Sequence, residues 1–226
     1  MSAQTVVITG ANRGIGLEFT RIFRARGDHV IALCRRAGDE LPATGAEIVD
    51  GIDVAAADGP ARAAAAIGAK RIDVLINNAG VLTDESFDNL ADPEALERMR
   101  RQFDINALAP LRITEALADR LGEGSKVALI TSRMGSIADN DSGGRYGYRM
   151  SKAALNAGGR SLAIDLAPRG VAVGLLHPGF VRTEMTGRRG QVEPAEAAAM
   201  LVERIEALNA DNAGRFFHAN GEELPW

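Results

Sequence analysis

Short runs of apolar residues alternate along this chain with longer segments in which apolar residues recur at helical spacing. The short runs predict strands over residues 5–9, 29–34, 47–50, 72–76, 126–132, 171–176 and 214–219. The longer segments predict helices near residues 15–26, 59–68, 93–120, 147–167 and 195–208.

The first five strand runs are short and mostly apolar, which is typical of parallel strands covered on both faces. Strands separated by helices imply right-handed crossovers. The pattern therefore predicts an α/β doubly wound parallel sheet of about seven strands with helices on both faces. No linker or repeat interrupts it, so residues 1–226 are expected to form one domain.

Composition narrows the class of protein. Hydrophobic residues make up 46% and charged residues 25% of the 226 residues, as in ordinary globular proteins. The formal net charge of −4 argues against a nucleic-acid or anionic-membrane partner. Cys34 is the single cysteine, so a reducing compartment is expected. No apolar stretch approaches the roughly 18 residues of a membrane helix. We therefore expect a soluble, cytoplasmic protein.

The first strand runs into a turn, Thr9 to Gly16, with glycines at 10, 14 and 16. Glycine permits positive φ and lets a bulky anion approach the free N–H groups and the positive dipole end of the helix that follows. The turn therefore predicts a phosphate-binding site. Glycines alone leave one alternative open, a strand–helix turn that binds nothing.

The second strand ends without the acidic residue that dinucleotide-binding folds often use to hold the adenosine ribose. That position falls on Cys34, and Arg35 and Arg36 follow it. With Arg13 in the glycine turn, these guanidinium groups are suited to the 2′-phosphate of NADP(H). Any one of them alone is equally a solvated surface charge, so use of NAD(H) stays open. After the third strand, the carboxylate of Asp53 either accepts from the adenine amino group or caps its loop.

Polar residues also follow the fourth strand. The string Asn77-Asn78-Ala79-Gly80 offers amide groups to neighbouring strands and to a ligand, and its small pair lets a cofactor pass close; Asx-turn chemistry is the alternative. Farther on, Pro110 cannot donate to the carbonyl of Asn106, four residues earlier. A helix kinked there would hold a polar side chain and a free carbonyl beside the sheet.

Ser132 follows the fifth strand, and Tyr148 and Lys152 lie four residues apart on the next helix, so both project from one face. A phenol of ordinary pKa near 10 exchanges protons poorly at neutral pH. A lysine cation about 4 Å away supplies on the order of 4 kcal/mol at an effective dielectric constant near 20, which lowers that pKa by a unit or more. The three residues predict a carbonyl-reducing centre.

The sixth strand ends at His177, which precedes a proline and is interpreted as structural. Thr183 could bond a carboxamide. The short, polar segment between Thr183 and Pro194 should cover the substrate pocket, and its length favours an open site.

Taken together, these residues resemble the short-chain dehydrogenase/reductase family over nearly the whole chain. The family's cofactor turn corresponds to Thr9–Gly16, its Asn-Asn-Ala-Gly string to 77–80, its Tyr-xxx-Lys pair to Tyr148 and Lys152, and its Pro-Gly-x-Val-x-Thr segment to 178–183. Residues 132–152 and 214–226 are most similar to the C-factor-like carbonyl reductase branch, whose members are usually NADP(H)-dependent.

The resemblance implies a Rossmann-type fold and hydride transfer between a nicotinamide and a small carbonyl or alcohol substrate. Ser132 would hold the substrate oxygen and Tyr148 would donate the proton. Lys152 would lower the tyrosine pKa and bind the nicotinamide ribose, and Asn106 would hold a proton-relay water. The cofactor-binding residues expected are Gly10, Asn12, Arg13, Gly14, Ile15, Gly16, Arg35, Asp53, Val54, Asn78, Ala79, Gly80, Tyr148, Lys152, Pro178, Gly179, Val181 and Thr183.

One spacing departs from the family. Ser132 lies farther from Tyr148 than usual, and Ser136 lies nearer to the common distance, so Ser136 is held in reserve as the catalytic serine. Tyr146 is rejected as the proton donor because Met150, not a lysine, follows it at the fourth position.

Two other functions were weighed. A cofactor-binding regulatory or signalling protein with little catalysis stays as the alternative, because C-factor-like proteins are associated with signalling. A nucleotide-sugar epimerase is set aside, since it needs a longer C-terminal substrate region. A homo-oligomer, dimer or tetramer, is expected from small residues on the 147–167 helix, although the same residues would also suit packing on the protein's own sheet.

Overall fold

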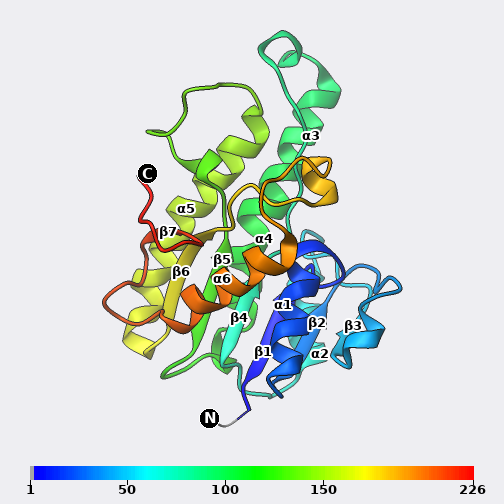
Figure 1. The fold of residues 1–226 in the computed structure, drawn as a ribbon, viewed down its shortest axis with the longest axis vertical. Coiled ribbons are helices and arrows are strands. Elements are labelled where there is room, and N and C mark those ends of the chain that lie inside the picture. Colours follow the sequence, from blue (N-terminus) through cyan, green and yellow to red (C-terminus); the bar gives the residue numbers. More distant parts are fainter. Residues whose placement is uncertain (1–2) are drawn as a thin grey trace.

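The computed structural model describes residues 3–226, which form a seven-stranded, fully parallel sheet in the order β3-β2-β1-β4-β5-β6-β7 (Figure 1). The strands are β1 Thr5–Thr9, β2 His29–Leu33, β3 Glu47–Val49, β4 Val74–Asn77, β5 Lys126–Ile130, β6 Ala172–His177 and β7 Phe216–His218. The order runs outward in both directions from the β1–β4 pair, so this pair is the topological switch point, where ligands of such sheets bind. The predicted doubly wound architecture is confirmed.

Helices cover both faces of the sheet. They are α1 Gly14–Ala25, α2 Gly59–Ile67, α3 Pro93–Phe103, α4 Ala109–Ala116, α5 Tyr146–Leu166 and α6 Pro194–Glu206. Alternate residues of each strand face opposite layers: Val7 and Leu75 lie in the core beneath α2, α4 and α5, while Ile8 and Ile76 lie in the core beneath α1 and α6. Figure 1 shows α3 extending beyond the carboxyl edge of the sheet, where it packs along α5. None of the helices in residues 3–226 combines the length and apolar character needed to cross a bilayer.

The single helix predicted over 93–120 is wrong in detail. A π-helical turn, Asp104–Leu108, separates α3 from α4, and the N–H of Ala109 donates to the carbonyl of Asp104. Pro110 lacks an N–H, so the carbonyl of Asn106 loses its ordinary donor, and a widened turn accommodates the loss. The predicted irregularity at Pro110 is therefore present as a π-turn.

Hydrogen bonds tie the end of β1 to the end of β4. The hydroxyl of Thr9, which is buried, accepts from the N–H groups of Asn78 at 3.0 Å and Ala79 at 3.1 Å. In return, Nδ2 of Asn78 donates to the carbonyls of Thr9 and Gly10, each at 3.1 Å. The glycine turn and the Asn-Asn-Ala-Gly string are thereby held against each other at the switch point.

Thr9→Val should expose the importance of this tie, because it keeps the side chain's shape but leaves two N–H groups without their acceptor. We expect the free energy of unfolding to fall by about 2 kcal/mol, measured by urea denaturation. Thr5→Val, at the other end of the same strand, is the matched control and should change it by less than about 0.5 kcal/mol. Equal effects of the two substitutions would contradict this account.

Candidate active site

A large cleft of about 920 Å³ runs along the carboxyl edge of the sheet, and we call it the large cleft. Most of the residues predicted to bind a cofactor line it: Gly10, Asn12, Arg13, Gly14, Ile15, Arg35, Asp53, Val54, Asn78, Ala79, Gly80, Tyr148, Lys152, Pro178 and Thr183. Three predicted residues do not. Gly16 lies behind the turn, Val181 is buried, and Gly179 lines a second cavity.

The glycine turn is shaped by close backbone packing. Gly10 has φ +65°, and a Cβ on it would lie 2.9 Å from Cα of Ala79. A Cβ on Gly16 would lie 2.2 Å from the carbonyl oxygen of Gly10. The helix α1 begins here with no side chain capping its first N–H groups, and Gly14 and Ile15 line the cleft. An uncapped helix end with its positive dipole facing a cleft fits the pyrophosphate of a dinucleotide.

The far end of the large cleft carries the three arginines predicted from the sequence. Arg13, Arg35 and Arg36 all line it, and Arg13 pairs with Glu184 across the mouth. Cys34 stands at the end of β2, where burial raises the pKa of its thiol to about 11, so it carries no negative charge to repel a phosphate. Asp53 also accepts from the N–H of Ala55 at 3.0 Å, which is the loop-capping role weighed above.

Tyr148, Lys152 and Ser132 meet where the large cleft adjoins a second cavity. All three are buried, and Nζ of Lys152 lies 5.9 Å from the centroid of the Tyr148 ring. That ammonium donates to the carbonyl of Ile130 at 2.8 Å, which anchors it at the end of β5. A hydrogen bond links Ser132 to the Tyr148 side chain. The predicted trio is therefore brought together.

The electrostatics of this trio differ from the sequence-based expectation. The pKa of Tyr148 is raised, chiefly by burial, and the Ser132 hydrogen bond and the charge of Arg145 only partly offset that rise. Burial also lowers the pKa of Lys152 to about 7. The expectation that Lys152 dominates and lowers the tyrosine pKa is wrong for this geometry, because desolvation disfavours the charged form of both groups.

The two candidate serines are placed differently. Ser132 lines the second cavity, and its hydroxyl accepts from the N–H of Met134 at 3.2 Å. The hydroxyl of Ser136 donates to the carbonyl of Trp226 and accepts from the N–H of Asp139, each at 3.1 Å, and it lines neither cavity. The geometry favours Ser132. Tyr146, the first residue of α5, also lines neither cavity.

Asn106 is buried in the π-turn with its side chain fully engaged. Nδ2 donates to the carbonyl of Val81 at 2.8 Å and to the hydroxyl of Ser151 at 3.0 Å, and Oδ1 accepts from the N–H of Val81 at 2.9 Å. These bonds join the segment after β4 to the helix that carries Tyr148. Any role of Asn106 toward a water molecule would fall to its backbone carbonyl.

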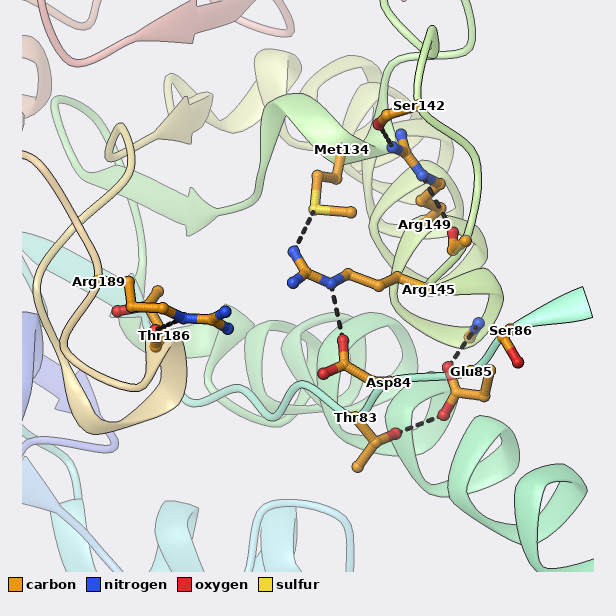
Figure 2. Close-up of polar contacts among 12 residues, drawn as sticks. Thr83, Asp84, Glu85, Ser86, Met134, Ser142, Arg145, Arg149, Thr186 and Arg189 are labelled. Atoms are coloured by element: carbon orange, nitrogen blue, oxygen red, sulfur yellow. Dashed lines mark hydrogen bonds and ion pairs between the residues drawn. The ribbon is translucent and has the colours of Figure 1, made fainter. Parts of the chain in front are cut away.

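Glu85 is a functional-site residue that sequence reasoning missed. Its carboxylate is buried and accepts from the hydroxyl of Thr83 at 2.6 Å, from Nε2 of Gln102 at 3.1 Å and from the N–H of Gly147 at 3.2 Å (Figure 2). Its backbone carbonyl accepts from the N–H of Arg145 at 2.7 Å. Glu85 thus holds the start of α5, and no spacing in the sequence marks it, because its partners come from three separate segments.

The second cavity, about 330 Å³, opens beside Tyr148, and we call it the side pocket. Ser132, His177 and Phe180 are among its lining residues. Burial, with the nearby charges, lowers the pKa of His177 to about 3, and its ring packs edge-on against His218 with centroids 5.0 Å apart. His177 is therefore neutral at physiological pH, which fits the structural interpretation. Residues 3–226 contain no cluster of His, Cys, Asp and Glu able to hold a metal ion.

Comparisons with known proteins place this geometry in context. A family model described as short chain dehydrogenase matches residues 4–194. The 1-hydroxy-2-glutathionyl-2-methyl-3-butene dehydrogenase of Rhodococcus sp. (strain AD45) is 40% identical over 228 residues, covering 98% of this chain and 99% of the relative. The C-signal protein of Myxococcus xanthus is 46% identical over 157 residues, covering 69% of this chain and 93% of the relative.

Solved structures agree. The NADPH-bound carbonyl reductase from chicken fatty liver has a TM-score of 0.89 at 28% identity, with both chains covered in full. A carbonyl reductase from Pseudomonas aeruginosa PAO1 in complex with NADP has a TM-score of 0.84 at 35% identity, covering 99% of this chain and 100% of the other.

Lys152→Met should stabilise the fold, because it removes a charge held away from water. Below about pH 7 the lysine is charged in the folded and unfolded states, so the desolvation penalty is fully present; it fades as pH rises toward the unfolded pKa near 10.4. We expect the variant's free energy of unfolding to exceed that of the wild type by on the order of 2 kcal/mol near pH 6, and by much less near pH 10.

Urea denaturation at the two pH values measures the difference, and Lys70→Met is the control. Lys70 is exposed and paired with Glu47, so its replacement should bring no gain near pH 6. A Lys152→Met gain that is the same at both pH values would contradict the assigned pKa.

Proposed function

Because the chain belongs to the short-chain dehydrogenase/reductase family, we propose that it is an NADP(H)-dependent oxidoreductase that interconverts a small carbonyl compound and its alcohol. The observation that carries the proposal is the meeting of Ser132, Tyr148 and Lys152 at the junction of the large cleft and the side pocket. The Rhodococcus relative is named for dehydrogenation of a hydroxylated compound, which supports the same reaction class.

A nicotinamide dinucleotide bound in the large cleft would supply or accept the hydride. The hydroxyl of Ser132 would donate to the substrate oxygen, and Tyr148 would transfer its phenolic proton to that oxygen as negative charge develops there. A raised pKa suits this step, because it keeps the phenol protonated at neutral pH. The tyrosinate left behind would be stabilised by Ser132, by Arg145 and by the Lys152 cation.

Lys152 would also return the proton. With a pKa of about 7, its ammonium exchanges protons readily near neutral pH. The π-turn leaves the carbonyl of Asn106 without its ordinary helical donor, so that carbonyl is suited to hold a water molecule on the exchange route. This proposal retains the relay role for Asn106 and assigns it to the backbone.

The preference for NADP(H) over NAD(H) rests on charge at the far end of the large cleft. Arg13 and Arg35 would bind the 2′-phosphate, where a carboxylate at the position of Cys34 would repel it. The NADP-bound structures of similar proteins support this assignment.

A regulatory role with little catalysis is the second candidate, because the chain is 46% identical to a protein named C-signal over 69% of its length. The intact Ser132, Tyr148 and Lys152 favour catalysis. Binding of NADPH without oxidation in the presence of any of a broad panel of aldehydes, ketones and quinones would favour regulation.

Tyr148→Phe should abolish carbonyl reduction while leaving NADPH binding intact, because only the proton donor is lost. We expect turnover, followed by NADPH oxidation at saturating carbonyl, to fall at least about 100-fold, and the dissociation constant from fluorescence titration to change by less than about threefold. Tyr146→Phe, on the same helix but outside both cavities, is the matched control and should keep full turnover. Substantial residual turnover in Tyr148→Phe would overturn the assignment.

Arg13→Ala and Arg35→Ala should each raise the KM for NADPH by about tenfold and leave the KM for NADH nearly unchanged, since only NADPH carries the 2′-phosphate. Arg26→Ala, at the opposite end of α1, is the control and should alter neither value. Parallel changes with both cofactors would mean that the arginines do not discriminate between them. Steady-state kinetics with the two cofactors measure the effect.

A further inference from the structure

The walls of the side pocket carry more positive than negative charge, although the chain as a whole has a formal net charge of −4. Four arginines line it, Arg133, Arg145, Arg149 and Arg189, against two carboxylates, Asp84 and Asp139. These groups lie around Tyr148 and Ser132, on the side away from the arginines of the large cleft. The excess charge therefore belongs to the space where the proposed function puts the substrate.

Two of these arginines have carboxylate partners. Arg133 lies 3.4 Å from Asp139 and 3.1 Å from Glu222, so it is neutralised on both sides. Nε of Arg145 donates to Asp84 at 2.7 Å, and on its other edge Nη1 faces only the sulfur of Met134, at 4.0 Å. A thioether is a weak acceptor, so that edge of Arg145 is free for a stronger one.

The other two have only neutral partners among residues 3–226. Nη2 of Arg149 donates to the hydroxyl of Ser142 at 2.9 Å, and its Nε donates to backbone carbonyls. Nε of Arg189 donates to the carbonyl of Thr186 at 3.2 Å. Figure 2 shows the guanidinium groups of Arg145 and Arg189 pointing toward each other from opposite sides.

We infer that the side pocket selects a substrate with an anionic group, a carboxylate or a phosphate, at the end opposite its reacting carbonyl. Arg189 and Arg149 would bind the anion by charge-assisted hydrogen bonds, and the free edge of Arg145 would add to them. Leu82, Met134 and Phe180 would contact an apolar stem between the two ends. The inference rests on the proposed function and deepens it, by naming the substrate class and its specificity residues.

The test compares matched aldehydes that differ in charge: 4-carboxybenzaldehyde, 4-formylphenyl phosphate and the neutral methyl 4-formylbenzoate. With NADPH, we expect the KM of at least one anionic aldehyde to be about tenfold lower than that of the ester, a gap that narrows in high salt. The arm with the lower KM identifies the anion as carboxylate or phosphate. Equal KM values for all three would overturn the inference.

Arg189→Gln and Arg149→Gln should each raise the KM of the preferred anionic aldehyde by about tenfold, with kcat and the KM of the ester changed by less than about threefold. Arg169→Gln, which removes the same charge beyond the far end of α5, is the control. Thermal unfolding of each variant checks that it is folded. A loss confined to kcat, or one shared equally by the ester, would contradict the assigned role.

A binding measurement separates failure of this inference from failure of the proposed function. Calorimetric titration of NADP⁺-loaded protein with 4-(hydroxymethyl)benzoate, 4-(hydroxymethyl)phenyl phosphate and the neutral methyl ester of the benzoate needs no turnover. Tighter binding of an anionic compound than of the ester, weakened in Arg189→Gln, would support the anion site even if no aldehyde were reduced. Equal or absent binding of all three would overturn it, whereas reduction of the neutral aldehyde alone would leave the proposed function standing.

Discussion

The hydrogen bonds of Thr9 and Asn78 hold together the two strands between which the sheet changes direction. Parallel strands on either side of this point diverge through their helical crossovers, and the space between those crossovers is the large cleft. Because both residues end their strands with side chains turned toward each other's backbone, the turn that faces a dinucleotide and the string beside it move as one unit. The phosphate-binding geometry is thus a consequence of sheet pairing.

Desolvation sets the chemistry at the other end of the cleft. Tyr148 and Lys152 are both removed from water, and each resists charge in the absence of a close counter-charge. A phenol that stays protonated and a lysine that titrates near neutral pH form a donor and a reservoir suited to reduction. The same burial works against stability, which is a common balance at active sites.

The sequence predicted the fold class, the strand order's consequence for ligand binding and most residues of the cleft, because short motifs at strand ends report local geometry. It could not distinguish Ser132 from Ser136, since the difference lies in a hydrogen bond from Ser136 to the distant Trp226. It missed Glu85 for the same reason, and it predicted the direction of the tyrosine pKa wrongly because charge spacing along a helix carries no information about burial. The arginines of the side pocket come from three segments that only folding brings together.

The π-turn between α3 and α4 has a further consequence. A π-turn amounts to one extra residue in an otherwise α-helical path, and each residue of an α-helix turns the chain by about 100°. The extra residue therefore sets the rotational phase of α3, including the direction in which Gln102 faces. Gln102 donates to Glu85, and Glu85 receives the first N–H groups of α5. The angular phase of one helix thus reaches, through two side chains, the position from which Tyr148 meets its substrate.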